Sequence, residues 1–247
     1  MTIHNAVENG KIDIVRQLLH ENPHLVNLKD SDNDAPLHIA AWQRKTKIAG
    51  LLLSYEADVN AHGDSGRTPL HYAVESDSKP LIKLLIDKGA DSRLTSDAGI
   101  TPLYSAASSG SRDIVDLFLK LGQPIDVASS IYIDGPNAVL EKIQSDADFI
   151  NSTTYVDNLI WDAIRVQSVG LTKYLLQHGV KLNQKINGTY PLMDAIAHKN
   201  EALVKLLLEN RADVSIKDHA GRGILRFCEI YSVPSNIIEL LKKHGVS

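Results

Sequence analysis

The chain has 247 residues, 43% hydrophobic and 23% charged, with 30 acidic against 26 basic side chains and a formal net charge of −4. This is the composition of an ordinary globular protein, and its acidic balance argues against nucleic-acid binding, which usually needs a basic surface. No apolar run approaches the roughly 18 residues required to cross a bilayer, and the single cysteine, Cys228, excludes an intramolecular disulfide. Because the N-terminus lacks the basic and apolar pattern of a signal peptide, we expect a cytoplasmic protein.

A phrase with proline as its second residue recurs along the first half of the chain. It reads APLHIA at residues 35–40, TPLHYA at 68–73 and TPLYSA at 101–106, with 33 residues between successive prolines. Proline in the first turn of a helix gives up an N–H that has no partner there, and its φ is already helical. Each phrase therefore predicts the start of a helix, and its small alanine allows that helix to approach the next one closely.

A second phrase follows each of these helix starts. It reads IAGLLL at residues 48–53, LIKLLI at 81–86 and IVDLFL at 114–119. Apolar residues three and four positions apart predict a second helix with a stripe that faces the core. A third phrase closes the unit, EADVN at 56–60 and GAD at 89–91, where glycine accepts the left-handed conformation that ends a helix.

Together these three phrases resemble the ankyrin repeat in content, order and period. The resemblance implies an all-α, ankyrin-repeat solenoid of stacked helix–turn–helix units with short β-hairpin fingers. Weaker copies extend the array to about eight repeats including two caps, so we expect residues 1–247 to form a single ankyrin-repeat domain. Each repeat is anchored on one inner-helix position: Ala6, Ala40, Ala73, Ala106, Ile131, Ala163, Ala195 and Cys228.

The step between the fourth and fifth anchors, Ala106 and Ile131, is only 25 residues. The missing residues correspond to a finger, so we expect a shortened finger between repeats four and five, near residues 122–128. Two interpretations are open: a surface deletion that the fold tolerates, or a notch that shapes the binding face.

Two exit positions depart from the glycine of the third phrase. Glu56 replaces it in repeat two and Arg211 in repeat seven. If φ is positive at these positions, each replacement costs about 1 kcal/mol.

The sequence assembles no catalytic, metal or cofactor site. The GDSG string at residues 63–66 is similar to the nucleophile segment of trypsin-like proteases, but it lies at an expected finger turn and lacks that fold's remote partners. His20 and His24 are separated by a proline, and no cysteine or carboxylate joins them at the spacing of a zinc site. We expect Cys228 to be packed in the core. The chain is therefore expected not to be an enzyme and to need no cofactor.

The resemblance implies that a partner protein binds at the fingertips and along the exposed side of the inner helices. Trp42 is the leading candidate, because no repeat position requires tryptophan and because tryptophan is enriched in interface hot spots. The alternative is that Trp42 packs on a neighbouring helix, at Glu75 or Val7. The candidate partner-binding residues are Trp42, Gln43, Asp32, Asp34, Asp64, Arg67, Glu75, Ile100, Tyr155, Arg165, His198 and Arg222.

These candidates divide by charge. Carboxylates dominate the N-terminal part of the expected face, whereas Arg165, His198 and Arg222 lie in the C-terminal part. If exposed, the two parts would attract a partner with a complementary charge pattern, and the alternative is charge that only confers solubility.

Asn60 occupies the position that asparaginyl hydroxylases modify in some ankyrin proteins. The alternative is that its side chain caps a turn. We expect a non-enzymatic protein–protein interaction scaffold, a monomer that binds another protein and neither nucleic acid nor membrane. The functional alternatives are a regulatory or inhibitory subunit of an enzyme, or a substrate of an asparaginyl hydroxylase.

Overall fold

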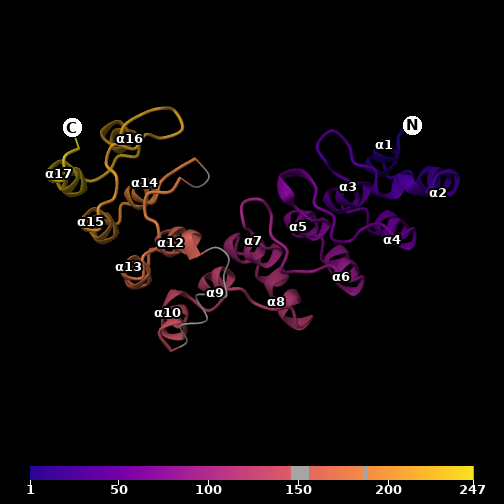
Figure 1. The fold of residues 1–247 in the computed structure, drawn as a ribbon, viewed down its shortest axis with the longest axis horizontal. Helices are drawn as coiled ribbons and strands as arrows, with labels where there is room; N and C mark the ends of the chain where they lie inside the picture. The colour runs from indigo at the N-terminus through magenta and orange to yellow at the C-terminus, as the bar shows by residue number, and fades with distance from the viewer. Residues whose placement is uncertain (146–155, 186–187, 247) are drawn as a thin grey trace. The chain divides into compact units, whose positions relative to one another are not determined.

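The computed structural model of the chain describes residues 1–145, 156–185 and 188–246 (Figure 1). The chain divides into two compact units, Met1–Ser129 and Ser130–Ser247. In both units the described residues form consecutive helix pairs, each an inner helix followed by an outer helix, and no sheet. The predicted all-α architecture is confirmed.

The first unit contains four complete helix pairs. The inner helices α1, α3, α5 and α7 pack side by side in one row, and α2, α4 and α6 pack in a second row behind them (Figure 1). The bounds are α1 (Ile3–Glu8), α2 (Ile12–Glu21), α3 (Pro36–Trp42), α4 (Thr46–Ser54), α5 (Pro69–Glu75), α6 (Lys79–Asp87), α7 (Pro102–Ser108) and α8 (Arg112–Lys120), with short 3₁₀ helices η1 (Pro23–Asn27) and η2 (Asp64–Gly66) in the loops.

The boundary between the units falls within α9 (Val127–Ile133), and the second unit continues the pairing. Its inner helices α12, α14 and α16 pack in sequence, and its outer helices α13, α15 and α17 do the same. The bounds are α10 (Pro136–Ser145), α12 (Val156–Arg165), α13 (Val169–Gln177), α14 (Pro191–Ala197), α15 (Glu201–Glu209), α16 (Ile224–Ile230) and α17 (Ser235–Lys243).

The histidine of the opening phrase fixes the start of the inner helix. His38 Nδ1 accepts the Ala35 N–H at 3.0 Å, and His38 Nε2 lies 2.9 Å from the carbonyl oxygen of Ala61 in the next loop. His71 repeats this arrangement with the Thr68 N–H and the Ile100 carbonyl. Burial lowers the pKa of His71 to about 4 and holds the pKa of His38 below its usual value. These histidines therefore have a structural role at the start of the inner helix.

The core lies along the contact between successive helix pairs. The six anchoring alanines are fully buried, Ile131 is 2% exposed and Cys228 is 1% exposed. Small residues are needed there because neighbouring inner helices approach each other closely. Behind them, the apolar stripes of the outer helices fill the space between the rows, with Leu52, Leu85 and Phe118 fully buried.

The exit turns after α4, α6, α8, α13, α15 and α17 each contain a residue with a left-handed φ. Gly89 has a φ of 90°, and Glu56 and Arg211 have φ values of 63° and 64° at the matching positions. Non-glycine residues adopt this region at a cost because of their Cβ atom. The positive φ expected at Glu56 and Arg211 is therefore present.

An asparagine joins each of three repeats to the exit turn of the next one. Asn60 donates to the Gly89 carbonyl at 3.2 Å, and its Oδ1 accepts the Asp91 N–H at 2.8 Å. Asn27 makes the same pair of hydrogen bonds with the turn at residues 56–58, and Asn183 with the turn at residues 211–213. This is the capping role that was the alternative to modification at Asn60.

The link between α8 and α9 is short. It consists of residues 121–126, whereas residues 55–68 and 88–101 connect the preceding pairs. Asp126 at its end accepts the Ser129 N–H at 2.8 Å, and this bond caps the start of α9.

Candidate functional site

Five of the predicted binding residues lie around the side chain of Tyr72 on α5. The Tyr72 hydroxyl donates to both carboxylate oxygens of Asp34, at 3.2 and 3.1 Å. The guanidinium carbon of Arg67 lies 5.0 Å from the centroid of the Tyr72 ring. Trp42 meets the same ring edge-on, with the ring centroids 6.1 Å apart. We call Asp34, Trp42, Asp64, Arg67, Tyr72 and Glu75 the Tyr72 cluster.

Two ion pairs hold Arg67 in place over the ring. Its guanidinium donates to Asp64 Oδ2 at 2.6 Å and to Glu75 Oε2 at 3.2 Å, so it extends from a fingertip to the last residue of α5. Partial burial opposes the charged form, but the hydrogen bond to Asp64 and the charge of Glu75 keep the pKa of Arg67 above its ordinary value. Burial, together with the charge of Asp34, raises the pKa of Tyr72. The tyrosine is therefore a neutral donor at physiological pH.

Trp42 ends α3 and remains largely in solvent. Its residue surface is 52% exposed, the largest exposed fraction among the described tryptophan and phenylalanine residues. Its aromatic contact is with Tyr72 on the neighbouring helix α5, three residues before Glu75. The indole is supported by this ring, and about half of the residue surface is open to a partner.

The loops that precede the inner helices form fingers, residues 28–35, 61–68 and 94–101. Main-chain hydrogen bonds close each finger, such as the Gly63 N–H to the Arg67 carbonyl at 2.8 Å and the Ser96 N–H to the Ile100 carbonyl at 3.0 Å. The described fingers contain no extended strand pairing; one isolated bridge joins Lys217 and Gly223.

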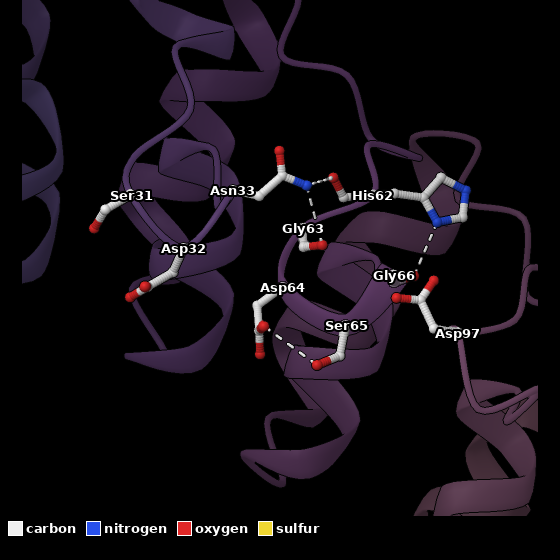
Figure 2. Close-up of a pocket in the computed structure, with 9 residues that line it drawn as sticks. All are labelled: Ser31, Asp32, Asn33, His62, Gly63, Asp64, Ser65, Gly66 and Asp97. Atoms are coloured by element: carbon white, nitrogen blue, oxygen red, sulfur yellow. Dashed lines mark hydrogen bonds between the residues drawn. The ribbon is translucent and has the colours of Figure 1, made fainter.

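A cavity of about 570 Å³ opens between these three fingers (Figure 2). Its lining is polar: Ser31, Asp32, Asn33, His62, Gly63, Asp64, Ser65, Gly66 and Asp97. Figure 2 shows the Asn33 amide directed at the main chain of His62 and Gly63, whose carbonyls accept from it at 3.3 Å. The cavity therefore offers carboxylates and carbonyls, which suit a ligand rich in hydrogen-bond donors.

Gly63 is required by close approach of the neighbouring repeat. A Cβ atom there would overlap Asp34 Oδ1 and crowd the His38 ring. Asp34 Oδ1 also accepts the Asp64 N–H at 3.0 Å, so the carboxylate of one finger organises the next finger. Asp34 is half-buried, and its carboxylate accepts hydrogen bonds from the Asp64 N–H and the Tyr72 hydroxyl. It therefore orders the surface, and this differs from the open binding position proposed from the sequence.

The GDSG string forms this finger turn. Ser65 has a φ of 53°, and its hydroxyl hydrogen-bonds to Asp64 Oδ1 at 3.2 Å. His62 Nδ1 lies 2.8 Å from the Gly66 carbonyl oxygen. Within the described part of the chain, no histidine hydrogen-bonds to the Ser65 hydroxyl.

Three further candidates belong to the first unit. Asp32 is exposed on the cavity wall, and Gln43 is exposed directly after α3. Ile100 is half-buried, and its carbonyl oxygen is hydrogen-bonded to His71 Nε2. Asp32 and Gln43 are thus open to a partner, while the main chain of Ile100 serves the fold.

The remaining candidates belong to the second unit or lie outside the described residues, as Tyr155 does. Arg165 and His198 are exposed at the ends of α12 and α14, and His198 Nδ1 lies 2.8 Å from the Asp194 carbonyl. Arg222 donates to Asp218 Oδ2 at 2.6 Å, and the Asp218 side chain is only 4% exposed. Arg222 therefore stabilises its own finger.

Tyr72 was not singled out from the sequence. It occupies the variable position of the TPLHYA phrase, where the equivalent residues are Ile39 and Ser105. The available signal was a tyrosine on the inner helix that follows the one carrying the unexplained tryptophan, since adjacent inner helices pack side by side.

Neither a metal centre nor a membrane helix is found in the part of the chain that the structure describes. Across residues 1–145, 156–185 and 188–246, no three His, Cys, Asp or Glu side chains come together to hold an ion. No helix within the same ranges combines the length and apolar character needed to cross a bilayer.

Comparison with known proteins identifies the family. A family model described as ankyrin repeats (3 copies) matches residues 2–63, 62–129 and 128–218, which is most of the chain. The chain belongs to the ankyrin-repeat family. Ankyrin repeats are in general protein–protein interaction modules, and the exposed face of this ankyrin-repeat chain is the natural place to look for a partner.

Individual relatives match this ankyrin-repeat chain over 53 residues. The FYVE zinc finger domain protein UPA1 of Mycosarcoma maydis is 40% identical there, over 22% of this chain and 4% of that protein. Ankyrin repeat domain-containing protein 49 of Drosophila melanogaster is 42% identical, over 22% of this chain and 25% of its own length. The chain thus matches a quarter or less of either relative.

A solved structure shares the fold over nearly its whole length. The ankyrin repeat domain of Bcl-3, described as a unique member of the IkappaB protein family, matches with a TM-score of 0.51 and 22% identity. The alignment covers 98% of each chain. At this identity the likeness supports the ankyrin-repeat fold alone.

Proposed function

We propose that this ankyrin-repeat chain is a non-enzymatic scaffold that binds a partner protein through the Tyr72 cluster and the adjoining fingertips. The observation that supports this most directly is the exposed indole of Trp42, held edge-on against Tyr72. Tryptophan is over-represented among the residues that dominate binding energy, and here Trp42 is supported by the ring of Tyr72.

Pre-organisation supports the same proposal. Arg67 is fixed by Asp64 and Glu75, and Tyr72 is fixed by Asp34. Ordering a long side chain at an interface costs about 0.5–1.5 kcal/mol. Because folding has already ordered these side chains, a partner would lose less free energy on binding.

The two side chains that could act in catalysis or be modified, Cys228 and Asn60, do not support such a role. The thiol of Cys228 is 1% exposed, and burial raises its pKa to about 11, so it is not a nucleophile at neutral pH. Asn60 has both polar atoms of its side chain engaged by the next repeat. We therefore assign Asn60 a structural role, and no contact in the described residues favours a role as an enzyme subunit.

The proposal extends to the organisation of the chain. We infer one functional domain of eight repeats, acting as a cytoplasmic monomer on a protein ligand and not on nucleic acid or membrane. The net charge of −4 supports the exclusion of nucleic acid. The short link at residues 121–126 is proposed to be a tolerated deletion, because Asp126 caps α9 without a finger.

Photo-crosslinking in the native cell, followed by mass spectrometry, tests the proposed function. The full chain, Trp42→Ala and Leu119→Ala are compared; Leu119 is 40% exposed but lies on the outer helix α8. We expect a protein that is captured by the wild type and by Leu119→Ala and is lost with Trp42→Ala. Capture that Trp42→Ala leaves intact would refute the site, and no captured protein would refute the function.

A further inference from the structure

We infer that the partner segment is extended and basic, and that it places one cationic side chain in the fingertip cavity and another on Trp42. This inference rests on the proposed function and names the chemistry of the ligand. The surface consists of Asp32, Trp42, Asp64, Arg67, Glu75 and Asp97, all in the first unit, and we call it the acidic face.

The charges of the acidic face do not balance. Four carboxylates face two cations, the guanidinium of Arg67 and the ammonium of Lys29 nearby, and Arg67 is already shared between Asp64 and Glu75. Asp32 and Asp97 are exposed on the cavity wall, and neither forms an ion pair within the described residues. A basic segment would supply the missing counter-charge, whereas an acidic segment would meet like charge, which costs several kcal/mol at an interface.

Two basic side chains of the protein itself, Lys29 and Arg67, already bind at this surface and show which contacts it makes with cations. The ammonium of Lys29 donates to the His62 carbonyl at 2.9 Å, on the finger that lines the cavity. The guanidinium of Arg67 rests on an aromatic ring between two carboxylates. Both arrangements are internal examples of the contacts that a partner's lysine or arginine would make with the remaining carbonyls and carboxylates.

Trp42 supplies the second point of attachment. Its exposed face can take the aliphatic stem or the cationic head of a basic side chain, since cations are attracted to the indole π face. Glu75 and Arg67 lie across the shared ring of Tyr72, so the tryptophan sits at the edge of the charged network rather than apart from it.

The distance between the two points sets the form of the segment. The cavity lies at the fingers that precede the inner helices, and Trp42 is the last residue of the seven-residue helix α3. Seven helical residues span about 10 Å, which an extended chain covers in about three residues. The cavity residues of this repeat, 31–33, precede α3, so this length is a lower bound and a segment with two basic residues at least three positions apart is needed to reach both points.

Fluorescence anisotropy with defined peptides tests the inference. The probe is a fluorescein-labelled octapeptide of serine and glycine with two arginines three positions apart, and its matched control carries aspartate at both positions. We expect the arginine peptide to bind the full chain at low salt and the aspartate peptide not to bind. Binding of both peptides with similar affinity, or of neither, would overturn the inference.

Three variants assign the contacts. We expect Trp42→Ala to weaken binding of the arginine peptide about fivefold, and the double variant Asp32→Asn/Asp97→Asn to weaken it about tenfold. Arg67→Gln releases Asp64 and Glu75 from their internal counter-ion, so it should tighten binding about threefold. Asp87→Asn, an exposed carboxylate on the outer helix α6, is the matched control and should change nothing.

The variants also separate this inference from the proposed function. Circular dichroism and thermal melts first establish that each variant folds. Weaker binding with Arg67→Gln, or unchanged binding with Asp32→Asn/Asp97→Asn, would overturn the basic-segment assignment. Loss of a captured cellular partner with Trp42→Ala would still uphold the protein-binding function in that case.

Discussion

The hydroxyl of Tyr72 and the carboxylate of Asp34 join two repeats through hydrogen bonds of 3.2 and 3.1 Å. The same carboxylate accepts the Asp64 N–H, so one side chain couples two fingers and an inner helix. Because Trp42 and Arg67 both contact the Tyr72 ring, the position of the proposed binding residues depends on this pair.

Tyr72→Phe tests this dependence. The variant removes the donor and leaves a half-buried carboxylate with one partner fewer, so we expect the free energy of unfolding to fall by about 1–3 kcal/mol. Urea denaturation followed by circular dichroism measures the loss, and the emission maximum of Trp42 should shift. Tyr55→Phe is the control, since the Tyr55 hydroxyl makes no hydrogen bond within the described residues. An equal effect of both variants would contradict the coupling.

The fold could be predicted from the sequence, whereas the Tyr72 cluster could not. Prolines 33 residues apart and buried alanines repeat in every well-formed unit, because each repeat must pack on the next. Tyr72 and Asp34 occur together in only one pair of repeats. Because both occupy variable positions, their hydrogen bond produces no pattern that recurs along the sequence. Sequence reasoning found five members of the cluster as separate surface candidates and missed the side chain that brings them together.

The exit turns provide a second prediction. Glu56→Gly and Arg211→Gly should each raise the free energy of unfolding by about 1 kcal/mol, because glycine adopts the left-handed φ of 63° or 64° without the clash of a Cβ atom. Thermal melts of the full chain measure the gain. Gly89→Ala is the reciprocal control: its φ is 90° and its surroundings are open, so it should destabilise through backbone strain alone. Glycine variants that are less stable than the wild type would contradict this account.

The asparagine bridges predict a third outcome. Asn60→Ala removes two hydrogen bonds to the next repeat, so we expect a loss of about 1–2 kcal/mol in unfolding free energy. Asn60→Asp retains the oxygen that accepts the Asp91 N–H but cannot donate to the Gly89 carbonyl, and its loss should be intermediate. Hydrogen exchange at Asp91 locates the effect. Equal stability of all three proteins would show that the bridge contributes nothing.

The buried histidines predict how stability depends on pH. His38 and His71 each use Nδ1 as an acceptor, and a proton there would oppose a main-chain N–H. Burial lowers the pKa of His71 to about 4, below its value in the unfolded chain, so its contribution is complete above about pH 6.5 and is lost as the pH falls toward 4. His71 adds a slope of about 1.4 kcal/mol per pH unit within that window, and the lowered pKa of His38 acts in the same direction.

Urea titrations between pH 4 and 7 measure this slope. His71→Gln should be less stable than the wild type at neutral pH, because its side chain cannot reproduce both hydrogen bonds. Its stability should also fall less steeply with acid, by the slope of one histidine. A slope identical to that of the wild type would show that His71 remains neutral in the unfolded chain or charged in the folded one.

Asp194 on α14 predicts the opposite dependence on pH. Its Oδ2 atom is buried with no hydrogen-bond partner among the described residues, and burial raises the pKa of this carboxyl although the charges of His198 and Arg165 oppose the shift. A raised pKa means that the contribution of the protonated acid is fully present below the unfolded value and is lost as the pH rises through the folded one. Asp194→Asn, which cannot ionise, should therefore stabilise the chain at pH 7 by about 1 kcal/mol.

The gain should disappear near pH 3, where the wild-type carboxyl is protonated in both states. Asp213→Asn is the control of opposite sign, because hydrogen bonds from Ser215 lower the pKa of Asp213. That variant should lose stability at neutral pH and lose none in acid. If Asp194→Asn and Asp213→Asn shift the unfolding midpoint at pH 7 in the same direction, burial is not what distinguishes the two carboxylates, and Asp194 is not a site of unfavourable charge.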